Sequence, residues 1–529
     1  YFYSTYETED EAVPLSGPKV IVLGSGPIRI GQGIEFDYSA VHAVEALREA
    51  GIKAIVINNN PETVSTDYHL SDRLYFEPLT LEEVLNVVEQ EQDGLLGVIA
   101  QFGGQTALNL IGPLAAAGVP ILGTAPATIA LTEDRKQMAA VCAELGIRIP
   151  SWSIAHDQEE LAAFAPQIGF PVLVRPSYVL GGRGMRIIHN RDDLLGYLEA
   201  LGPHLRRQPV LVDQYLEDAI EIDVDGIGDG RDVYTVIMEQ IEAAGVHSGD
   251  SACVYPAQTL ATDVLAQVES YTARLVAHLQ IRGLINVQYA VKDGEVYLLE
   301  VNARASRTVP FASKATGVPL ARLATQLILG ALLADVDIVA PDPAGPVAVK
   351  GVVFPFSKFP ALVPRLGPEM QSTGESMGRG LDFATAFARA QQGAGFAPVP
   401  LGGAILIAAD SLTGPAWNRL VHLLQGSGFT IRTTPCTAER LWVHGIHAAA
   451  MGDAAVAFAD PPALVAVLSP GDEGPTDSFA ATLAQAAIGA RLPYVATLRG
   501  LAAWLGPRPA GDAAPMPLAQ VRRRALALA

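Results

Sequence analysis

Apolar and polar residues alternate along residues 17–127 in the blocks expected of a parallel sheet covered by helices. Each short apolar run ends in glycine or asparagine and is followed by a stretch with helical periodicity. Buried parallel strands appear as continuous apolar runs, because both of their faces are covered. The runs are KVIVLGSG, KAIVINNN and GVIAQFGG, and the helical stretches are VHAVEALREAGI and LEEVLNVVEQEQ. The pattern predicts a β-α-β-α-β series that binds its ligand at the carboxyl ends of the strands.

The pattern becomes less regular after residue 127. Residues 388–402 are rich in glycine, alanine and proline and predict a linker. After the linker, apolar runs and helical stretches alternate again, which predicts a second small α/β unit. Between residue 127 and the linker we expect a helix around EDRK, a strand–turn–strand over 211–230, a helix over 263–280, a hairpin over 285–304 and a helical region over 317–335.

Composition narrows the class of protein. The 529 residues carry a net charge of −20 and are 50% hydrophobic, which excludes global disorder and argues against a nucleic-acid partner. Cys142, Cys253 and Cys436 lie far apart, so we expect neither a disulfide framework nor a structural zinc site. We also expect no membrane span, because no apolar run is long enough to cross a bilayer. These features predict a cytoplasmic protein.

The hairpin over 285–304 carries the first candidate site. Its turn is Asp293-Gly294, and a two-residue loop would point Gln288 away from Glu300. A three-residue loop with a bulge would pair residue 288 with residue 298, so that Gln288, Glu300 and Asn302 share one face. We expect the second register, because three oxygen donors on one face suit Mg²⁺. The alternative is an ordinary solvated sheet face.

Two arginines leave the same strand. Arg304 and Arg307 would stand where a phosphoryl group bound to the metal must lie. Their presence favours the metal site over the solvated face.

Three further stretches suit a nucleotide. RPSYVLGGRG (175–184) offers backbone N–H groups and two arginines to phosphates, although a plain turn is the alternative. DQYL (213–216) offers backbone groups to a purine edge, and Glu221 offers a carboxylate to ribose hydroxyls. A surface carboxylate is the alternative for Glu221. GVHSGDS (245–251) is a polar, glycine-rich loop in which His247 has nothing apolar to pack against.

Together these motifs resemble one family. NPETVSTD, QFGGQT, RPSYVLGGRGM, AGVHSGDSAC and RTVPFASKATG closely resemble the carboxy-terminal half of the carbamoyl-phosphate synthetase large subunit, strongly over residues 1–395 and weakly over 400–529. The resemblance implies four parts: a linker from a missing amino-terminal half (1–16), a Rossmann-like pre-ATP-grasp domain (17–127), an ATP-grasp carbamate-phosphorylating domain (128–395) and a degenerate methylglyoxal-synthase-like regulatory domain (400–529).

The resemblance also implies roles for single residues. The cofactors would be ATP and Mg²⁺ or Mn²⁺, with two ions expected and K⁺ as a further candidate. Arg304 and Arg307 would act on the transferred phosphoryl group, and Gln288, Glu300 and Asn302 would hold the metal. The ATP-binding residues would be Arg135, Arg175, Gly181, Gly182, Asp213, Gln214, Leu216, Glu221, Gly245, Val246, His247, Ser248, Gln288 and Glu300.

The implied reaction is ATP-dependent phosphorylation of carbamate, the last step of glutamine-dependent carbamoyl phosphate synthesis for pyrimidines and arginine. The implied partners are an amino-terminal bicarbonate-phosphorylating half and a glutamine amidotransferase small subunit, and an oligomer is compatible with the family. Candidate effector residues are Glu242, Asp250, Thr434 and Thr437. Gly351 replaces an acid that accompanies ornithine activation, and residues 400–529 contain no lysine, which argues against a nucleotide monophosphate effector.

Three other functions compete with this one. A dinucleotide-dependent oxidoreductase is disfavoured, because Gly31 comes too late after Gly24 and Gly26 and the second strand ends in Asn58 without a ribose-binding acid. A ligase of the biotin carboxylase type remains an alternative. So does an ATP-binding regulatory half without turnover.

Overall fold

The structure is a computed structural model. It describes residues 12–28, 33–176, 185–201, 209–342, 345–355, 366–397, 402–468 and 478–506, with residues 6, 8, 358, 399 and 400. The predicted phosphate-loop glycines Gly181 and Gly182 lie outside the described residues. The chain divides into two compact units: the first is Tyr1–Ile149, Ile222–Met238 and Thr259–Asp342, and the second is Pro150–Glu221, Glu239–Gln258 and Pro343–Ala529.

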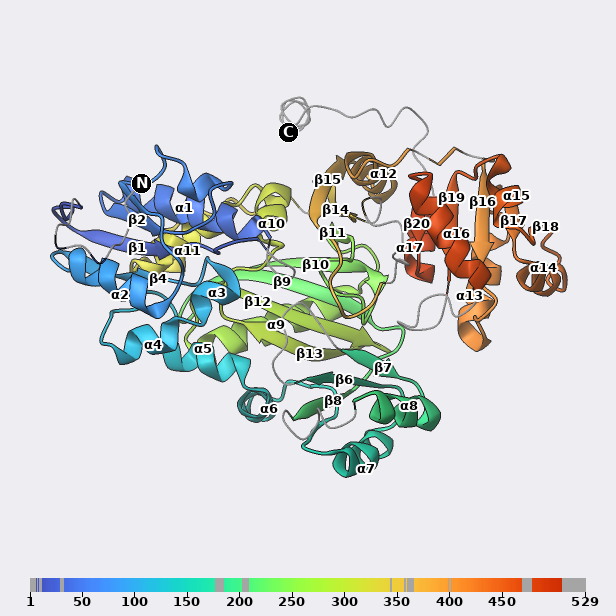
Figure 1. Cartoon of the computed structure of the whole chain (residues 1–529), viewed down its shortest axis with the longest axis horizontal. Helices are drawn as coiled ribbons and strands as arrows, with labels where there is room; N and C mark the ends of the chain where they lie inside the picture. Colours follow the sequence, from blue (N-terminus) through green and yellow to red (C-terminus); the bar gives the residue numbers. More distant parts are fainter. Residues whose placement is uncertain are drawn as a thin grey trace. The chain divides into compact units, whose positions relative to one another are not determined.

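The first unit contains a four-stranded parallel sheet of order β3-β2-β1-β4 (Figure 1). The predicted β-α-β-α-β series is confirmed. The sequence missed β3, whose three residues are too few to show a period. The strands are β1 (Lys19–Leu23), β2 (Lys53–Ile57), β3 (Arg73–Tyr75) and β4 (Leu95–Ile99).

Helices and short turns complete this unit. Helix α1 buries Phe36, Ala40, Val44 and Leu47, spaced at helical intervals along one face. The helices are α1 (Glu35–Glu49), α2 (Leu81–Gln90), α3 (Gly104–Leu108), α4 (Ile111–Ala116), α5 (Pro126–Glu133), α6 (Arg135–Glu144), α9 (Thr262–Leu279), α10 (Val309–Thr316) and α11 (Leu320–Ile328), with 3-10 turns η1 (Val64–Thr66) and η3 (Leu333–Asp335). The predicted helical region over 317–335 is therefore shorter than expected.

A buried ion pair fastens this parallel sheet to α2. Lys19 opens β1 with a fully buried side chain, and its Nζ donates to the Glu91 carboxylate at 2.8 Å. Arg73 and Tyr75 of β3 donate to the other oxygen of Glu91 at 2.7 and 2.8 Å. The N–H of Leu15 also donates to Glu91, at 2.9 Å. Glu91 is the C-cap residue of α2, so its carboxylate connects this helix to β1, to β3 and to the segment that precedes β1.

A seven-stranded sheet has the order β13-β12-β9-β10-β11-β14-β15. The chain enters it at β9, and its pairings β12–β13, β10–β11, β11–β14 and β14–β15 are antiparallel. The strands are β9 (Ile220–Asp229), β10 (Val233–Ala243), β11 (Cys253–Tyr255), β12 (Arg282–Lys292), β13 (Glu295–Asn302), β14 (Val347–Val353) and β15 (Gly374–Gly380).

The predicted three-residue hairpin loop is wrong. Lys292 pairs with Glu295, so the loop is Asp293-Gly294 alone, and both residues have positive φ (52° and 82°) as a type I′ turn requires. The register then shifts between Tyr289 and Gln288, which leaves Leu299 as an extra residue. This bulge pairs Gln288 with Glu300. The shared face that we expected from a longer loop therefore arises from a bulge within the strand.

The second unit contains a small antiparallel sheet of order β5-β8-β6-β7. Its core includes Leu161 and Ala165 of α7 with Leu194 and Tyr197 of α8. The predicted strand–turn–strand over 211–230 is observed as β8 followed by β9. The elements are β5 (Trp152–Ala155), α7 (Gln158–Ile168), β6 (Val172–Pro176), β7 (Arg186–Ile188), α8 (Arg191–Leu201) and β8 (Val210–Gln214).

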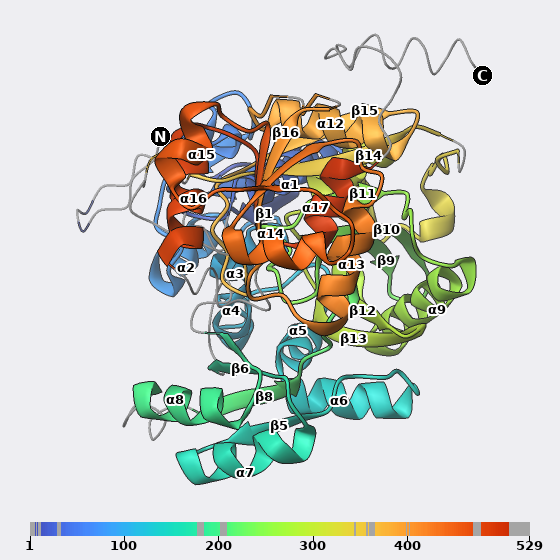
Figure 2. The ribbon, with the colours of Figure 1, turned by 90° about the vertical axis from the view of Figure 1, so that its right-hand side faces the viewer.

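A five-stranded parallel sheet of order β18-β17-β16-β19-β20 follows in the same unit. One face packs against α13, α14 and α17, and the other against α15 and α16 (Figure 2). The elements are β16 (Ala404–Ala408), α13 (Gly414–Leu424), β17 (Thr430–Thr433), α14 (Pro435–Trp442), β18 (Ala449–Ala450), α15 (Ala454–Ala459), β19 (Leu464–Val467), α16 (Ser478–Gly489), β20 (Tyr494–Val495) and α17 (Leu498–Leu505).

The predicted linker over 388–402 starts too early. Helix α12 (Phe383–Gly393) runs into it and buries Ala386, Phe387 and Ala390. These residues share one helical face, and they pack in a cluster with Val347 and Val349 of β14. The glycine and proline content of the segment hid this helical period.

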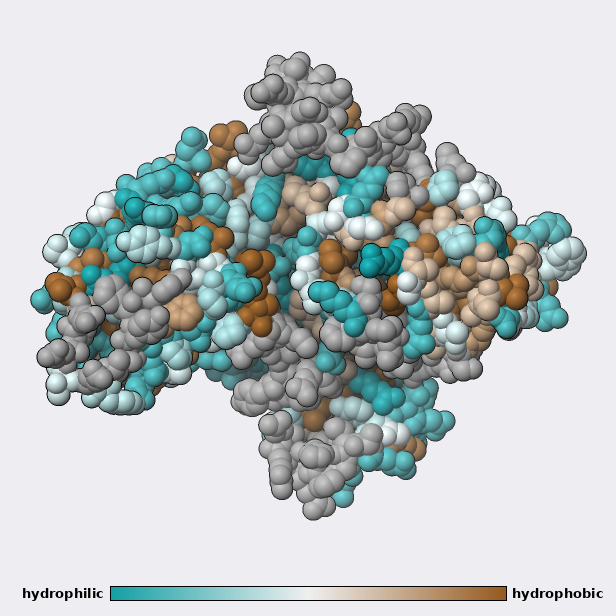
Figure 3. All heavy atoms as spheres, turned by 45° about the horizontal axis from the view of Figure 1, so that its top comes forward, coloured by the Kyte–Doolittle hydropathy of each residue, from teal (hydrophilic) through white to brown (hydrophobic). Residues whose placement is uncertain are grey.

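Hydrophilic side chains are spread over the face in Figure 3, with hydrophobic residues in small patches between them. Trp442 and Val443 at the end of α14 are among the large hydrophobic residues that are exposed. In the part of the chain that the structure describes, every helix is too short or too polar to cross a membrane.

Candidate active site

The hairpin of β12 and β13 presents the predicted metal ligands on one face. Gln288 lies opposite Glu300, and Asn286 lies opposite Asn302. Directly opposed residues of antiparallel strands point to the same side. Glu300 is exposed and makes no hydrogen bond or ion pair among the described residues.

These residues fit a hard divalent cation. They offer one carboxylate and amide oxygens, the donor types that Mg²⁺ and Mn²⁺ accept. Across the described residues there is no group of three or more His, Cys, Asp or Glu that could hold a metal. Gln288, Glu300 and Asn302 do not form such a group, because two of the three side chains are amides.

A carboxylate that the sequence did not indicate lies beside these residues, on the neighbouring strand β9. Asp225 of β9 is fully buried, and its Oδ1 accepts from Asn286 Nδ2 at 3.0 Å and from Ser306 Oγ at 2.6 Å. Burial raises the pKa of Asp225 to about 6, against the hydrogen bonds that favour its charged form. Alternation along IEIDVDGIGD places Asp225 on the same face as Glu221 and Asp223, so the pattern indicated neither its burial nor its distant partners.

The turn after β13 carries the predicted arginines. Arg304 donates to the carbonyl of Ala305 at 2.9 Å, and its guanidinium carbon lies 5.9 Å from the ring centre of Phe36. Burial lowers the pKa of Arg304, while the charges of Glu300, Glu133 and Asp225 raise it. Arg304 therefore lies among carboxylates, one of which is Glu300 of the hairpin. Arg307 follows in the same turn and is half-buried.

The second unit holds most of the predicted nucleotide-binding residues, whereas Arg135, Gln288 and Glu300 belong to the first. Arg175 of β6 pairs with the buried Asp213 of β8, with 3.3 Å between Nε and Oδ2. Gln214 N–H donates to the Ser151 carbonyl at 2.7 Å, and the Leu216 carbonyl accepts from Ala219 at 3.1 Å. The strand end that we expected to meet adenine is thus held in place by its own backbone hydrogen bonds.

Glu221 and Gly245 are brought together, as nucleotide binding by both would require. Gly245 N–H donates to Glu221 Oε1 at 3.0 Å. Gly245 has a φ of +94°, and a Cβ there would lie 2.8 Å from the Tyr215 ring. Tyr215 in turn donates to the Ala244 carbonyl at 2.6 Å. Only glycine fits at this position.

Several hydrogen bonds hold the loop after Gly245 in place. His247 N–H donates to the Gly367 carbonyl at 2.8 Å, and its Nδ1 accepts from Gly249 at 3.0 Å. Val246 is buried, and the Ser248 carbonyl accepts from Lys350 Nζ at 3.0 Å. Because Nδ1 accepts a hydrogen bond, Nε2 carries the proton of neutral His247.

Comparisons with known proteins identify the family. Residues 16–131 match the model of the carbamoyl phosphate synthase preATP-grasp domain, and residues 134–336 match the model of the carbamoyl-phosphate synthase L chain ATP binding domain. The carbamoyl phosphate synthase large chain, C-terminal section, of Methanocaldococcus jannaschii is 52% identical over 466 residues, which cover 85% of this chain and 75% of the relative. The chain belongs to the carbamoyl phosphate synthase large-chain family. The family expected from the sequence motifs is confirmed.

Other members of the carbamoyl phosphate synthase large-chain family are longer. The large chain of a strain of Thermus thermophilus is 52% identical over 434 residues, which cover 82% of this chain but 41% of that relative. The chain thus spans less than half the length of this relative.

The fold is shared with more distant proteins. The biotin carboxylase domain of the 2-oxoglutarate carboxylase of Hydrogenobacter thermophilus has a TM-score of 0.56 at 17% identity, over 72% of this chain and 90% of that domain. At this identity the likeness concerns the fold alone.

Two of the predicted effector residues, Glu242 and Asp250, have hydrogen-bond partners within the chain. Glu242 is hydrogen-bonded by the Thr497 hydroxyl, and burial raises its pKa. Asp250 is buried and accepts from the N–H groups of Gln371 and Ser372, both at 2.8 Å. Asp250 therefore fastens the loop at 371–372.

The structure also brings the two predicted effector threonines together. Thr434 and Thr437 are buried, and both hydroxyls donate to Oδ1 of Asp410. Thr434 Oγ1 also accepts from Thr437 N–H at 3.3 Å and so caps α14. Arg440 lies over the Trp417 ring at 3.6 Å and donates to the Asp410 carbonyl at 3.0 Å. Both threonine hydroxyls thus donate to Asp410, a carboxylate of the protein itself.

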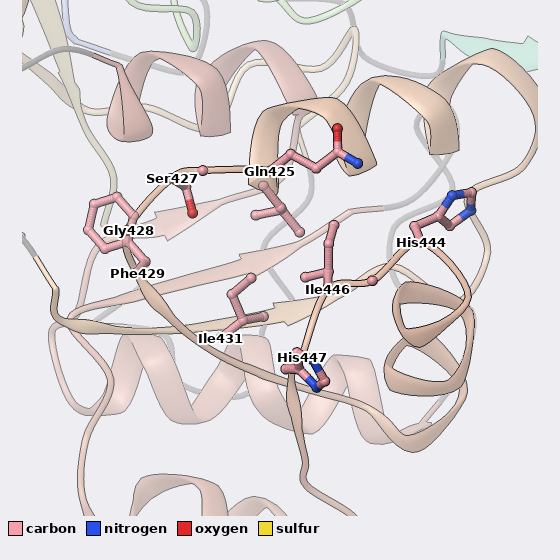
Figure 4. A pocket seen from close by; sticks show the side chains of 11 residues that line it. Gln425, Ser427, Gly428, Phe429, Ile431, His444, Ile446 and His447 are labelled. Atoms are coloured by element: carbon pink, nitrogen blue, oxygen red, sulfur yellow. The ribbon is translucent and has the colours of Figure 1, made fainter.

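A pocket of about 420 Å³ lies at the amino end of β17, in the five-stranded parallel sheet (Figure 4). It is lined by the loop before β17 and by the loop after α14, whereas Thr434 follows the carboxyl end of β17. His444 and His447 flank Ile446 on the second loop, and His444 Nε2 accepts from Trp417 Nε1 at 3.3 Å. The pocket is therefore separate from the two threonines.

Proposed function

We propose that this chain catalyses transfer of the γ-phosphoryl group of ATP to carbamate, giving carbamoyl phosphate and ADP. The observation that carries the proposal is the register of the hairpin, with Gln288, Glu300 and Asn302 on one face and Arg304 in the turn that follows. Oxygen donors beside a guanidinium are the recurring elements of phosphoryl-transfer sites.

In the proposed reaction a carbamate oxygen attacks the γ-phosphorus in line with the departing β-phosphate oxygen. A new P–O bond forms to carbamate as the bond to ADP breaks, and no covalent enzyme intermediate is needed. Mg²⁺ or Mn²⁺, two ions in the expected stoichiometry, would neutralise phosphate charge when held by Gln288, Glu300 and Asn302. Arg304 and Arg307 would stabilise the charge on the transferred group.

We assign the nucleotide-binding roles residue by residue, and Arg135 is among the residues that would contact the phosphates of ATP. Glu221 would accept from the ribose hydroxyls, and Gln214 and Leu216 would meet adenine through their backbone. Arg175, Gly181 and Gly182 would contact the phosphates, and Asp213 belongs to the tract that would meet adenine. Residues 245–248 would close over the nucleotide. K⁺ is a further candidate cofactor of the chain.

The wider assignment follows the family. We assign residues 17–127 to a pre-ATP-grasp domain, 128–395 to the ATP-grasp domain and 400–529 to a methylglyoxal-synthase-like domain, with 1–16 as the linker to a further half. A bicarbonate-phosphorylating half and a glutamine amidotransferase subunit would supply the carbamate. An oligomer and a cytoplasmic location belong to the same proposal.

The reverse reaction tests the proposal with the chain alone. Carbamoyl phosphate and ADP with Mg²⁺ should yield ATP, and Glu300→Gln should abolish ATP formation without lowering the thermal midpoint of the metal-free chain. Glu295→Gln is the matched control, because Glu295 lies on the same strand in a half-exposed pair with Arg148. Wild-type chain that binds ADP but transfers no phosphoryl group in either direction would contradict the proposal. ATP hydrolysis that requires biotin and bicarbonate would point to a biotin-dependent ligase instead.

A further inference from the structure

A chain of hydrogen bonds leads from the buried Asp225 to the metal-facing Asn302. Asn286 Nδ2 donates to Asp225 Oδ1 at 3.0 Å, and Asn302 Nδ2 lies 3.5 Å from Asn286 Oδ1. An ionised carboxylate can only accept hydrogen bonds. Asp225 therefore requires Asn286 to turn its NH₂ group inward, which leaves the Asn286 oxygen facing Asn302.

This polarity decides which atom Asn302 offers to the site. The Asn286 oxygen accepts from the NH₂ group of Asn302, so that the remaining Asn302 atom, Oδ1, is directed away from Asn286. A metal ligand must be an oxygen at this position, since the NH₂ group of an amide does not coordinate Mg²⁺ or Mn²⁺. With the reverse orientation, Asn302 would present N–H groups to the cation.

The same carboxylate oxygen also holds the turn that carries the arginines. Ser306 Oγ donates to Asp225 Oδ1 at 2.6 Å, and Ser306 Oγ in turn accepts from Thr308 N–H at 3.1 Å. Asp225 is thus connected to both sides of the site, the amide ligand and the turn between Arg304 and Thr308. The other oxygen, Oδ2, is buried without a hydrogen-bond partner among the described residues.

We propose that Asp225 is a positioning residue for the metal site: through Asn286 it fixes the side-chain amide of Asn302 with the oxygen toward the cation. The inference rests on the proposed function, because it assumes that Asn302 is a ligand. It goes beyond that function by assigning ligand orientation to a residue that touches neither metal nor nucleotide. A buried carboxylate with one unpartnered oxygen costs stability, so packing alone does not account for Asp225.

The test measures metal binding, not turnover. Mn²⁺ is titrated into the full chain at saturating ADP, and free Mn²⁺ is counted by electron paramagnetic resonance. Asp225→Leu removes the acceptor of Asn286 and leaves no space for a replacement water. We expect it to raise the Mn²⁺ Kd about tenfold, which is the lower end of the range for loss of a residue that orients a metal ligand. Asp225→Asn keeps an acceptor oxygen and should remain within about threefold of wild type.

Repeating Asp225→Leu in the Asn302→Asp variant distinguishes a role in orienting Asn302 from a general structural role. In Asn302→Asp the ligand is a carboxylate, which presents an oxygen in either orientation, so Asp225→Leu should then change the Mn²⁺ Kd by less than about threefold. The same loss in both backgrounds, or no loss in either, would overturn the inference. The thermal midpoint of the metal-free chain establishes that each variant is folded.

If Asp225→Leu does not fold, Asn286→Leu replaces it, because it removes the acceptor of Asn302 directly and leaves the hydrogen bond from Ser306 to Asp225 in place. We expect the same tenfold loss, again restricted to the Asn302 background. Wild-type chain that binds no Mn²⁺ with ADP would refute the metal site itself, and with it the proposed function. Wild-type chain that binds Mn²⁺ while both Leu variants match it would refute the positioning role alone.

Discussion

A guanidinium nitrogen of Arg135 lies 2.9 Å from the carbonyl oxygen of Leu299. Leu299 is the extra residue of the bulge in β13, so its backbone is left out of the ladder with β12. Arg135 supplies the hydrogen bond that the bulged carbonyl would otherwise lack. Because Glu300 follows directly, this contact fixes the strand immediately before the proposed metal-binding carboxylate.

We therefore expect Arg135→Met to slow ATP formation from carbamoyl phosphate and ADP about a hundredfold, as loss of one preorganised donor does in other enzymes. Arg135→Lys should fall between wild type and Arg135→Met, because lysine keeps the charge but not the planar fork. Steady-state rates at saturating ADP measure both. Arg148→Met is the control: Arg148 makes a half-exposed pair with Glu295 at the other end of β13, and its loss should change the rate less than about twofold.

Gly245→Ala should weaken ADP binding. The substitution places a Cβ against the Tyr215 ring in a backbone with φ of +94°, so Gly245 must shift and release its hydrogen bond to Glu221. We expect an increase of about tenfold in the ADP Kd by calorimetry, which is about 1.4 kcal/mol.

Gly395→Ala is the control that separates backbone strain at positive φ from the contact with the Tyr215 ring. Gly395 has nearly the same φ, +93°, but nothing lies within 4 Å of its Cβ position. Its substitution should cost about 1–2 kcal/mol of folding stability and leave the ADP Kd unchanged. Equal loss of ADP affinity in both variants would show that the Tyr215 contact is irrelevant.

The sequence predicted the face of the hairpin but not the way in which it forms. Asp293-Gly294 is compatible with two loop lengths, and the choice is made by a bulge at Leu299 whose carbonyl is satisfied by Arg135, 164 residues earlier. Local pattern contains no information about that partner. The parallel strands β1, β2 and β4 were predictable because their burial is encoded in continuous apolar runs.

Asp225 was missed for the same reason. Its partners Asn286 and Ser306 are 61 and 81 residues away, and a carboxylate on a strand gives no indication of them. Glu221 and Gly245 were predicted as separate elements: Glu221 lies near the start of β9, and Gly245 follows the end of β10. Residue types at a site can thus be predicted where motifs carry them, whereas contacts between distant strands depend on the tertiary fold.

Uridine or inosine monophosphate should not stabilise the chain. The Thr434 and Thr437 hydroxyls already donate to Asp410, whose negative charge opposes a phosphate. A ligand at about a hundred times its Kd would add about 2.7 kcal/mol of stability, so the thermal midpoint is a sensitive measurement. We expect no shift in wild type. A shift that Thr437→Val removes would show that these threonines still bind an effector.

Glu91→Gln should destabilise the first unit in a pH-dependent manner. Burial opposes the charge on Glu91, but hydrogen bonds from Lys19, the Leu15 N–H and Tyr75, with the charge of Lys19, outweigh it and lower the pKa below its ordinary value of 4.5. A lowered pKa in the folded state means that the unfolded state takes up its proton first as the pH falls. The stabilisation is therefore complete above about pH 4.5 and is lost as the pH falls through the folded-state pKa.

At pH 7 the substitution leaves Lys19 as an uncompensated buried charge, which costs about 3–5 kcal/mol. Urea unfolding followed by far-ultraviolet circular dichroism measures the loss, which should shrink as the pH is lowered below about 4.5. Glu45→Gln is the matched control, because Glu45 forms a partly exposed pair with His42 and its substitution should cost less than about 1 kcal/mol. A Glu91→Gln loss that stays constant from pH 7 to the acid limb would mean that packing, and not the charge of Glu91, holds β1 and β3 to α2.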